Sequence, residues 1–175
     1  MSDCCAVKDG SSTSDSCAVK VPPEQVPAVM ACPESGTRSK KVDLLTVRSL
    51  VLHLPFGMPV EQYYFCEAPG CDVVYFSSNP EAPVFRRRDL LVRVGLKEEH
   101  DPIPVCYCFG VARSDIRDEI RETGKSMLAE RIKAEVKAGH CACEVKNPSG
   151  KCCLGDVIRR VQEAQRALGR VAVSE

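Results

Sequence analysis

Six of the twelve cysteines in this chain lie in two short segments, and the residues between the segments have helical character. Residues 105–110 read VCYCFG, and residues 141–153 read CACEVKNPSGKCC. Alternate side chains of an extended backbone leave on the same side, so Cys106 and Cys108 can bind one iron ion after a slight bend. Cysteine thiolates are the usual ligands of iron–sulfur clusters. The spacing therefore predicts a metal cluster held by thiolates from both segments.

The charge balance and the cysteine content limit the class of protein. The chain has 24 Lys and Arg against 24 Asp and Glu, so its formal net charge gives no attraction to nucleic acid or to an anionic membrane. No apolar run approaches the roughly 18 residues of a membrane helix, and acidic residues interrupt the region where a signal peptide would be apolar. We therefore expect a cytoplasmic protein without membrane insertion. In that reducing compartment, twelve cysteines favour metal ligands over disulfides.

Residues 1–31 are rich in Ser, Asp, Val and Pro, and we expect them to form a flexible arm. The arm carries three thiols: Cys4, Cys5 and Cys17. Thiolates prefer soft ions such as Cu(I) or Hg(II), and a flexible arm can hand such an ion on. The alternative is that these are incidental thiols on a disordered tail. Their spacing leaves both interpretations open.

A second group of cysteines precedes the cluster segments. Residues 32–37 read CPESGT, which has the shape of a zinc knuckle, a tight turn that aims side chains at one ion. Residues 62–66 (QYYFC) and 72–76 (DVVYF) predict two short aromatic strands of a hairpin with Cys66 and Cys71 at its bases. The hairpin would complete a zinc site with the knuckle. The alternative is that both hairpin cysteines are small buried hydrophobic residues.

This zinc site has an incomplete ligand set. Only three cysteines contribute to it: Cys32, Cys66 and Cys71. A closed structural zinc site has four ligands, and Ser35 stands at the second ligand position of the knuckle. The fourth ligand stays open between an arm thiol, a carboxylate such as Glu34 or Asp72, and water. An open position would make the metal labile, and an empty site is a further alternative.

The zinc-type β domain is expected over residues 32–96. Residues 42–54 predict a strand that ends in a helical turn, and residues 84–85 and 90–94 predict further strand. The arginines at 86–88 are expected on a solvated face, with an anionic partner surface as the alternative. Residues 97–104 (KEEHDPIP) are polar and contain two prolines, so they predict a linker.

Three helices must position the cluster segments, within a domain expected over residues 105–169 and followed by a tail at 170–175. The first begins at Ser114 as N-cap, the second spans residues 126–138, and the third begins near residue 155. Helix N-termini stabilise anions, and a four-thiolate 2Fe-2S centre is anionic. Helix starts that follow both cysteine segments therefore suit a cluster. The apolar face of the third helix is expected to pack on the other two, with a homodimer interface as the alternative.

The motifs, taken in order, resemble a known family. VCYCFGV, a helical spacer and the CxC-EVKNPSGKCC segment are similar to the cluster domain of CopZ-type iron–sulfur metallochaperones, itself similar to the bacterioferritin-associated ferredoxin fold. CPESGT, YYFCEAPGCDVVYF and RVGLKEE resemble the small zinc-binding domain that precedes it in the same proteins. The resemblance covers residues 32–154. It implies an α+β fold, with a zinc-ribbon-like β domain followed by a helical 2Fe-2S domain.

The resemblance also implies two ligand sets. Zinc would lie near the three cysteines of the knuckle and hairpin, although Ser35 replaces a cysteine of the family pattern. The 2Fe-2S cluster would be held by four cysteines: Cys106, Cys108, Cys143 and Cys153. Cys152 is the alternative fourth cluster ligand, and Cys141 would be a spare thiol.

The function that the resemblance implies is metallochaperone-like handling of a soft heavy metal, copper or mercury, in metal resistance. The cluster would reduce Cu(II) to Cu(I). The family's copper chaperones carry a C-terminal heavy-metal-associated domain with an MxCxxC loop, which we expect this chain, ending at Glu175, to lack. The cargo thiols would then be those of the arm, with Cys141 and the unused member of the Cys152–Cys153 pair. The expected partner is a metal-transport or metal-resistance protein.

Two other functions compete with this one. The first is a small ferredoxin-like electron-transfer protein that docks a redox enzyme and has no metal cargo. The second is a purely structural zinc and iron–sulfur adaptor. The sequence contains no GxSxG, GxxxxGK or HExxH motif, so we expect no catalysis beyond an ancillary metal-reductase activity through the cluster.

Overall fold

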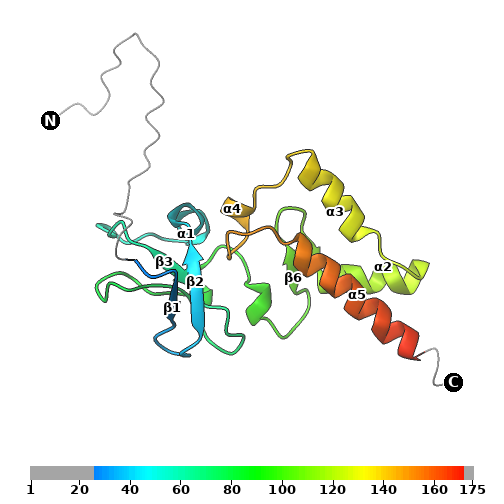
Figure 1. Cartoon of the computed structure of the whole chain (residues 1–175), viewed down its shortest axis with the longest axis horizontal. Coiled ribbons are helices and arrows are strands. Elements are labelled where there is room, and N and C mark those ends of the chain that lie inside the picture. Colours follow the sequence, from blue (N-terminus) through cyan, green and yellow to red (C-terminus); the bar gives the residue numbers. More distant parts are fainter. Residues whose placement is uncertain (1–25, 172–175) are drawn as a thin grey trace, which may run out of the picture.

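The computed structural model describes residues 26–171 of the chain, and the side chains of residues 26–167 (Figure 1). The arm thiols Cys4, Cys5 and Cys17 therefore lie outside the described residues, as does the side chain of Leu168. Figure 1 shows the strands of the N-terminal part on one side of the molecule and the longer helices on the other. The chain thus has a mixed α and β architecture.

The N-terminal part is built on a five-stranded antiparallel sheet with its strands in chain order. The strands are β1 (Val29–Ala31), β2 (Arg38–Val42), β3 (Tyr63–Phe65), β4 (Val73–Ser77) and β5 (Phe85–Arg86). The aromatic hairpin is confirmed, since β3 pairs with β4 and Tyr64 lies opposite Phe76. The sheet begins with β1, inside the range expected to be a flexible arm, because β1 pairs antiparallel with β2.

The strand predicted over residues 42–54 is wrong, because most of this segment is the helix α1 (Leu44–Leu50). Asp43 is its N-cap, and its side chain accepts a hydrogen bond from the amide of Leu45 at 2.8 Å. The helix buries one face, with Val47 fully inside the sheet core. A favourable cap and a buried helical face thus outweigh the strand preference of β-branched residues.

The strand predicted over residues 90–94 is also absent. Leu90 makes a single isolated bridge to Val51. Two short 3₁₀ turns flank this segment, η1 (Arg87–Asp89) and η2 (Gly95–Lys97). The Asp89 carboxylate accepts from the amide of Arg86 at 2.8 Å, which closes η1 and ends β5 after two residues.

The C-terminal part combines a two-stranded sheet with helices. The strands are β6 (Pro104–Cys106) and β7 (Val111–Ala112), and the helices are α2 (Arg113–Thr123), α3 (Leu128–Lys137), α4 (Cys143–Lys146) and α5 (Leu154–Val171). The three predicted helices are confirmed in number and order, and α4 is an additional short helix. The first begins one residue before Ser114, and the Asp115 carboxylate accepts from the amide of Ala112 at 2.8 Å in place of a serine cap.

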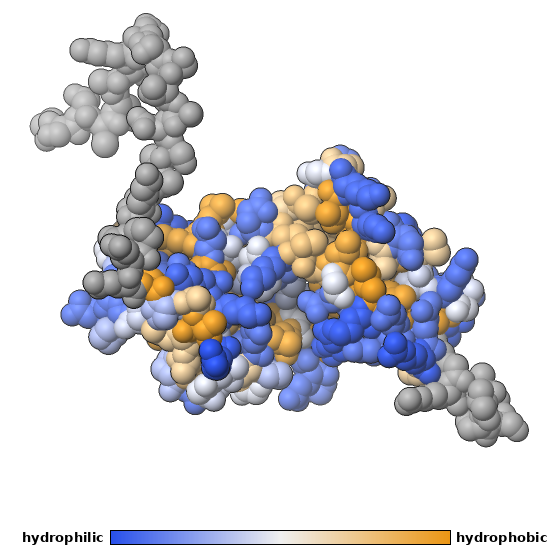
Figure 2. Space-filling model, in the orientation of Figure 1, coloured by the Kyte–Doolittle hydropathy of each residue, from blue (hydrophilic) through white to orange (hydrophobic). Residues whose placement is uncertain are grey.

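The helices α2 and α3 both pack against α5. Their core contains Ile116, Ile120, Val157 and Val161, which are all buried. Figure 2 shows a hydrophobic strip between α3 and α5 beside hydrophilic side chains along α5. The apolar face of the third predicted helix is therefore covered by the other two helices, as expected.

The two parts contact each other directly. The Tyr75 hydroxyl of β4 donates to the Pro148 carbonyl at 2.8 Å, and the Thr46 hydroxyl of α1 donates to the Glu144 carbonyl of α4 at 2.6 Å. Lys97, the first residue of the predicted linker, is buried rather than solvated. Within residues 26–171, no helix is both long and apolar enough to cross a membrane.

Candidate metal centres

Three buried cysteines converge where β1, β3 and β4 end or begin. The sulfur atoms of Cys32, Cys66 and Cys71 all lie within 4.8 Å of one another, and those of Cys32 and Cys71 are 3.9 Å apart. A zinc ion with tetrahedral ligands at about 2.3 Å places two sulfurs about 3.8 Å apart. The donor atoms and their spacing therefore fit zinc.

Two local turns bring these sulfurs together. In the knuckle, the Gly36 amide donates to the Cys32 carbonyl and the Cys32 amide to the Thr37 carbonyl, each at 2.9 Å. Gly36 has a φ of 68°, a conformation that glycine adopts without steric cost. In the hairpin, the Cys66 amide donates to the Val74 carbonyl at 2.9 Å. The sequence therefore encodes both halves of this site locally.

The surroundings of this site shift the pKa values of Cys32 and Cys71 in opposite directions. Burial acts to raise the pKa of Cys32, but hydrogen bonds from the Ser35 hydroxyl and from nearby backbone amides lower it to about 7. Burial raises the pKa of Cys71. The Lys97 Nζ donates to the Ala68 carbonyl at 2.7 Å and to the Cys71 carbonyl at 3.0 Å, which ties down the loop between Cys66 and Cys71.

The second group of cysteines forms two pairs, and each pair joins one cysteine of residues 105–110 to one of residues 141–153. The sulfur atoms of Cys108 and Cys143 are 3.6 Å apart, and Cys106 and Cys153 lie close enough that each shifts the pKa of the other. Cys106, Cys143 and Cys153 are buried, whereas Cys108 is half-buried. A 2Fe-2S centre is bound by four cysteine thiolates, so the donor set fits this group.

Strand and helix ends position these four thiols. Cys106 ends β6, and Gly110, with a φ of 64°, turns the chain back into β7. Cys143 begins α4, and Cys153 directly precedes α5, where its carbonyl accepts from the Val157 amide at 3.0 Å. The packing of α5 on the small sheet therefore sets the distance between the two segments.

Three of the four thiols have shifted pKa values. The hydrogen bond from Cys153 lowers the pKa of Cys106 to about 6, although burial opposes this shift. The same hydrogen bond and burial raise the pKa of Cys153. Burial and the hydrogen bond with Cys108 raise the pKa of Cys143 to about 12. One thiolate in the first pair is thus available at neutral pH, and a bound metal would displace the remaining protons.

The two remaining cysteines of the second segment are more accessible than three of these four thiols. Cys152 is exposed and Cys141 is half-buried. The structure therefore brings Cys153, rather than the alternative Cys152, next to Cys106. The assignment of Cys153 as the fourth cluster ligand remains a prediction.

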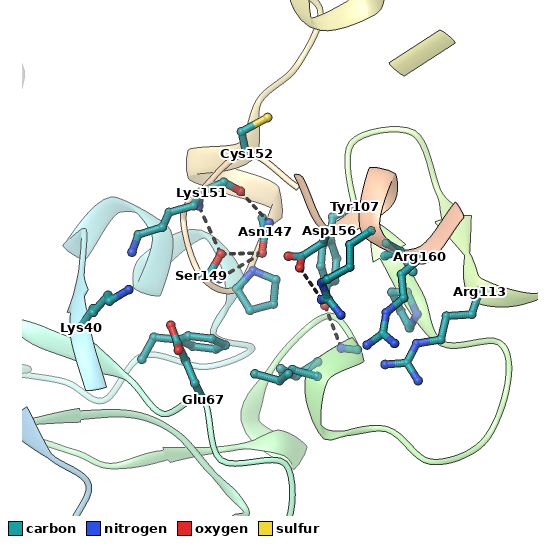
Figure 3. Close-up of a pocket in the computed structure, with 18 residues that line it drawn as sticks. Lys40, Glu67, Tyr107, Arg113, Asn147, Ser149, Lys151, Cys152, Asp156 and Arg160 are labelled. Atoms are coloured by element: carbon teal, nitrogen blue, oxygen red, sulfur yellow. Dashed lines mark hydrogen bonds and ion pairs between the residues drawn. The ribbon is translucent and has the colours of Figure 1, made fainter. Parts of the chain in front are cut away.

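A groove of about 370 Å³ lies between residues of the two parts, below Cys152 in Figure 3. Its cationic side chains come from distant elements: Lys40 of β2, Arg113 of α2, Lys151, and Arg159 and Arg160 of α5. Glu67 and Asp156 are its carboxylates, and Arg159 donates to Asp156 at 2.7 Å. The sequence did not indicate this groove, because its residues carry no local motif.

Comparison with known proteins places the chain in a family. Residues 29–91, which include the three-cysteine site, match the zf_CopZ family model, described as a zinc binding domain. The solved N-terminal domain of CopZ from Archaeoglobus fulgidus is 35% identical, and the match covers 74% of this chain and 96% of that domain with a TM-score of 0.57. The chain belongs to the CopZ N-terminal-domain family.

The match to the CopZ N-terminal domain extends beyond the zinc-binding domain. The zinc-binding domain ends at residue 91, about halfway along the 175 residues. Because the match covers 74% of the chain, it must include residues of the second, helical half. The copper chaperone CopZ of the same organism is 38% identical over 125 residues, which cover 71% of this chain and 58% of that protein. The chain therefore spans less than two thirds of the length of this curated relative.

Proposed function

We propose that this chain is a CopZ-like metallochaperone that carries zinc on Cys32, Cys66 and Cys71 and a 2Fe-2S cluster on a second set of cysteines: Cys106, Cys108, Cys143 and Cys153. The observation that supports the cluster is the arrangement of four thiols as two pairs, each joining the two segments. The family and its copper-chaperone relative support a role in metal handling.

The chain's own residues would hold and tune the cluster. The Ala142 amide donates to the Cys108 sulfur at 3.3 Å, and hydrogen bonds to ligand sulfurs raise the potential of an iron–sulfur centre by stabilising negative charge. The long helix α5 begins next to Cys153, so its positive end faces the same charge. When bound, the cluster supplies one electron, which converts Cu(II) to Cu(I). We propose no other catalytic activity.

The cargo site for Cu(I) or Hg(II) would use thiols that the cluster leaves free. Cys152 is exposed and Cys141 is half-buried, so both can be reached by a soft ion. The arm cysteines Cys4, Cys5 and Cys17 belong to the same proposal, although they lie outside the described residues. The receiving partner would be a metal transporter or a metal-resistance protein.

A small electron-transfer protein is the second candidate function. The half-buried Cys108 and the exposed Cys152 bring both cysteine segments to the surface. A cluster near the surface can exchange electrons with a docked redox enzyme, and such a protein would need no copper cargo.

Metal and spectral analysis of protein purified without oxygen tests the cluster. We expect about two iron and two sulfide per chain, visible absorption, and an EPR signal after reduction by dithionite. The Cys106→Ser and Cys143→Ser double variant should lose the absorption, whereas Cys141→Ser should keep it. Colourless wild-type protein without inorganic sulfide would contradict the proposal.

A Cu(I) titration against a competing chelator separates the two candidate functions. Stoichiometric binding that is lost in a Cys4→Ser and Cys5→Ser variant supports the chaperone. Absence of copper binding in cluster-loaded protein supports the electron-transfer role. Reduction of Cu(II) by the dithionite-reduced, desalted protein, at one electron per cluster, checks the reductase step.

A further inference from the structure

A hydroxyl oxygen lies beside the three-sulfur site. The hydroxyl oxygen of Ser35 lies 3.5 Å from the sulfur of Cys66. With zinc–sulfur and zinc–oxygen bonds of about 2.3 and 2.0 Å, tetrahedral geometry gives a sulfur-to-oxygen distance of about 3.5 Å. The Thr37 amide donates to the same oxygen at 3.3 Å, which orients its remaining lone pair. The spacing thus suits a site of three sulfurs and one oxygen.

The nearby carboxylates are engaged elsewhere. Glu34 forms an ion pair with Arg86. Asp72 lies 3.2 Å from the Arg87 guanidinium and 3.6 Å from that of Arg86. Among the described residues, no histidine or carboxylate joins the group of three sulfurs. A carboxylate ligand would therefore require that these ion pairs break.

The buried charge also favours a neutral fourth ligand. Three thiolates and one Zn²⁺ carry a single negative charge, and the one buried cation described beside the hairpin loop, Lys97 at 3% exposed, donates to the Cys71 carbonyl. A fourth thiolate would add a second negative charge without a described buried partner. Burying an unpaired charge is costly, whereas a hydroxyl ligand adds none.

We propose that the Ser35 hydroxyl oxygen is the fourth zinc ligand, so that zinc is held by three thiolates and one weak oxygen donor. Ser35 itself is exposed, while the three cysteines are buried, so the weak ligand faces solvent. Zinc would leave and enter through this corner. A site of this kind exchanges its metal faster than one with four thiolates. The inference rests on zinc binding at the three cysteines in the proposed function.

The test compares Ser35→Ala and Ser35→Cys in the full chain, loaded with Zn²⁺ or with Co²⁺ as a spectroscopic probe. We expect Ser35→Cys to give the spectrum of four-thiolate cobalt and to slow zinc transfer to a chelator by about tenfold or more. Ser35→Ala should speed the transfer by a similar factor and shift the cobalt bands. Ser49→Ala, which removes the α1 hydroxyl that donates to the Leu45 carbonyl, should change neither.

Each result has a separate meaning. If Ser35→Ala keeps the wild-type cobalt spectrum and transfer rate, water or another ligand fills the fourth corner and the inference is wrong. If wild-type protein binds neither metal, or if Cys66→Ser binds both unchanged, zinc binding in the proposed function is wrong as well. X-ray absorption of the zinc-loaded wild-type protein gives a check that does not depend on a variant, because it should fit three sulfurs and one oxygen.

Discussion

At the scale of single residues, the cluster cysteines differ in protonation although they share one type of side chain. In the metal-free protein Cys153 is held as a donor, and its hydrogen bond lowers the pKa of Cys106 to about 6. The folded pair therefore keeps one proton over a wide pH range. The unfolded pair loses both protons together, near the ordinary thiol pKa.

This difference predicts a pH dependence of stability for the reduced, metal-free protein. Between pH 6 and the ordinary thiol value of 9.0, the folded pair binds fewer protons than the unfolded pair, so stability rises with pH. The contribution of Cys106 is lost as the pH falls through about 6. Above 9.0 the raised pKa of Cys153 reverses the sign, because the folded pair then holds the extra proton.

Urea unfolding at a series of pH values measures this effect. The wild-type protein should gain stability from pH 6 to 9 relative to a Cys106→Ala and Cys153→Ala double variant. A difference between the two proteins that does not vary with pH would show that the pair shares no proton.

At the scale of elements, the sequence predicts what depends on local pattern. The alternation around β3 and β4 and the apolar periodicity of α2, α3 and α5 are local signals, and these elements are confirmed. The strand prediction over residues 42–54 fails because the Asp43 cap and the buried face of α1 outweigh the strand preference of the β-branched residues in this segment. The strand predicted over residues 90–94 is absent because the hydrogen bond from the Arg86 amide to the Asp89 carboxylate closes a turn that ends β5.

The candidate sites also differ in how far local sequence pattern predicts them. The three-cysteine site comes from a knuckle and a hairpin, so its members could be named from the sequence. The contact of Cys106 with Cys153 depends on how α5 packs, and spacing alone left Cys152 nearly as plausible. The knuckle motif locates Ser35 at a ligand position, but its contact with Cys66 and the contact of Lys97 with Cys71 depend on the tertiary fold, which no motif predicts.

The helical core predicts a specific loss of stability. Ile116 of α2 is 1% exposed and packs against α5, so Ile116→Ala should destabilise the fold by about 2–5 kcal/mol through lost burial and a cavity. Ile158→Ala removes the same side chain from α5 at a position that is 39% exposed, and should cost much less. Urea unfolding of both variants tests this, and equal losses would contradict the packing of α2 on α5.

The cap of α1 predicts a smaller loss. Asp43→Ala removes the acceptor for the Leu45 amide and should cost about 1 kcal/mol, since N-cap replacements by alanine lie between about 0.5 and 2 kcal/mol. Asp43→Asn keeps an acceptor and should cost little. Equal destabilisation by both variants, measured by urea unfolding, would show that the carboxylate acts in some other way.

At the scale of the whole molecule, the sheet supports the cysteine segment of the other part. Tyr75 of β4 and Thr46 of α1 donate to carbonyls of residues 144–148, which lie between Cys143 and Cys153. The zinc-type part therefore packs directly on the helical part and is not joined to it by a linker alone. It fixes the backbone that carries two of the four proposed cluster ligands.

A matched pair of buried tyrosines tests this support. The Tyr75 hydroxyl donates to the Pro148 carbonyl at 2.8 Å, and the Tyr64 hydroxyl donates to the Pro27 carbonyl at 2.7 Å, away from the cluster segments. Each Tyr→Phe change removes one hydrogen bond and should cost about 0.5–1.5 kcal/mol.

Only Tyr75→Phe removes a hydrogen bond to the segment that precedes Cys153. Amide hydrogen exchange over residues 143–153 should therefore be faster in Tyr75→Phe than in the wild type, and unchanged in Tyr64→Phe. Iron release to a chelator should likewise be faster in Tyr75→Phe and unchanged in Tyr64→Phe. Equal exchange rates in the two variants would mean that the cysteine segment is held by the helices alone.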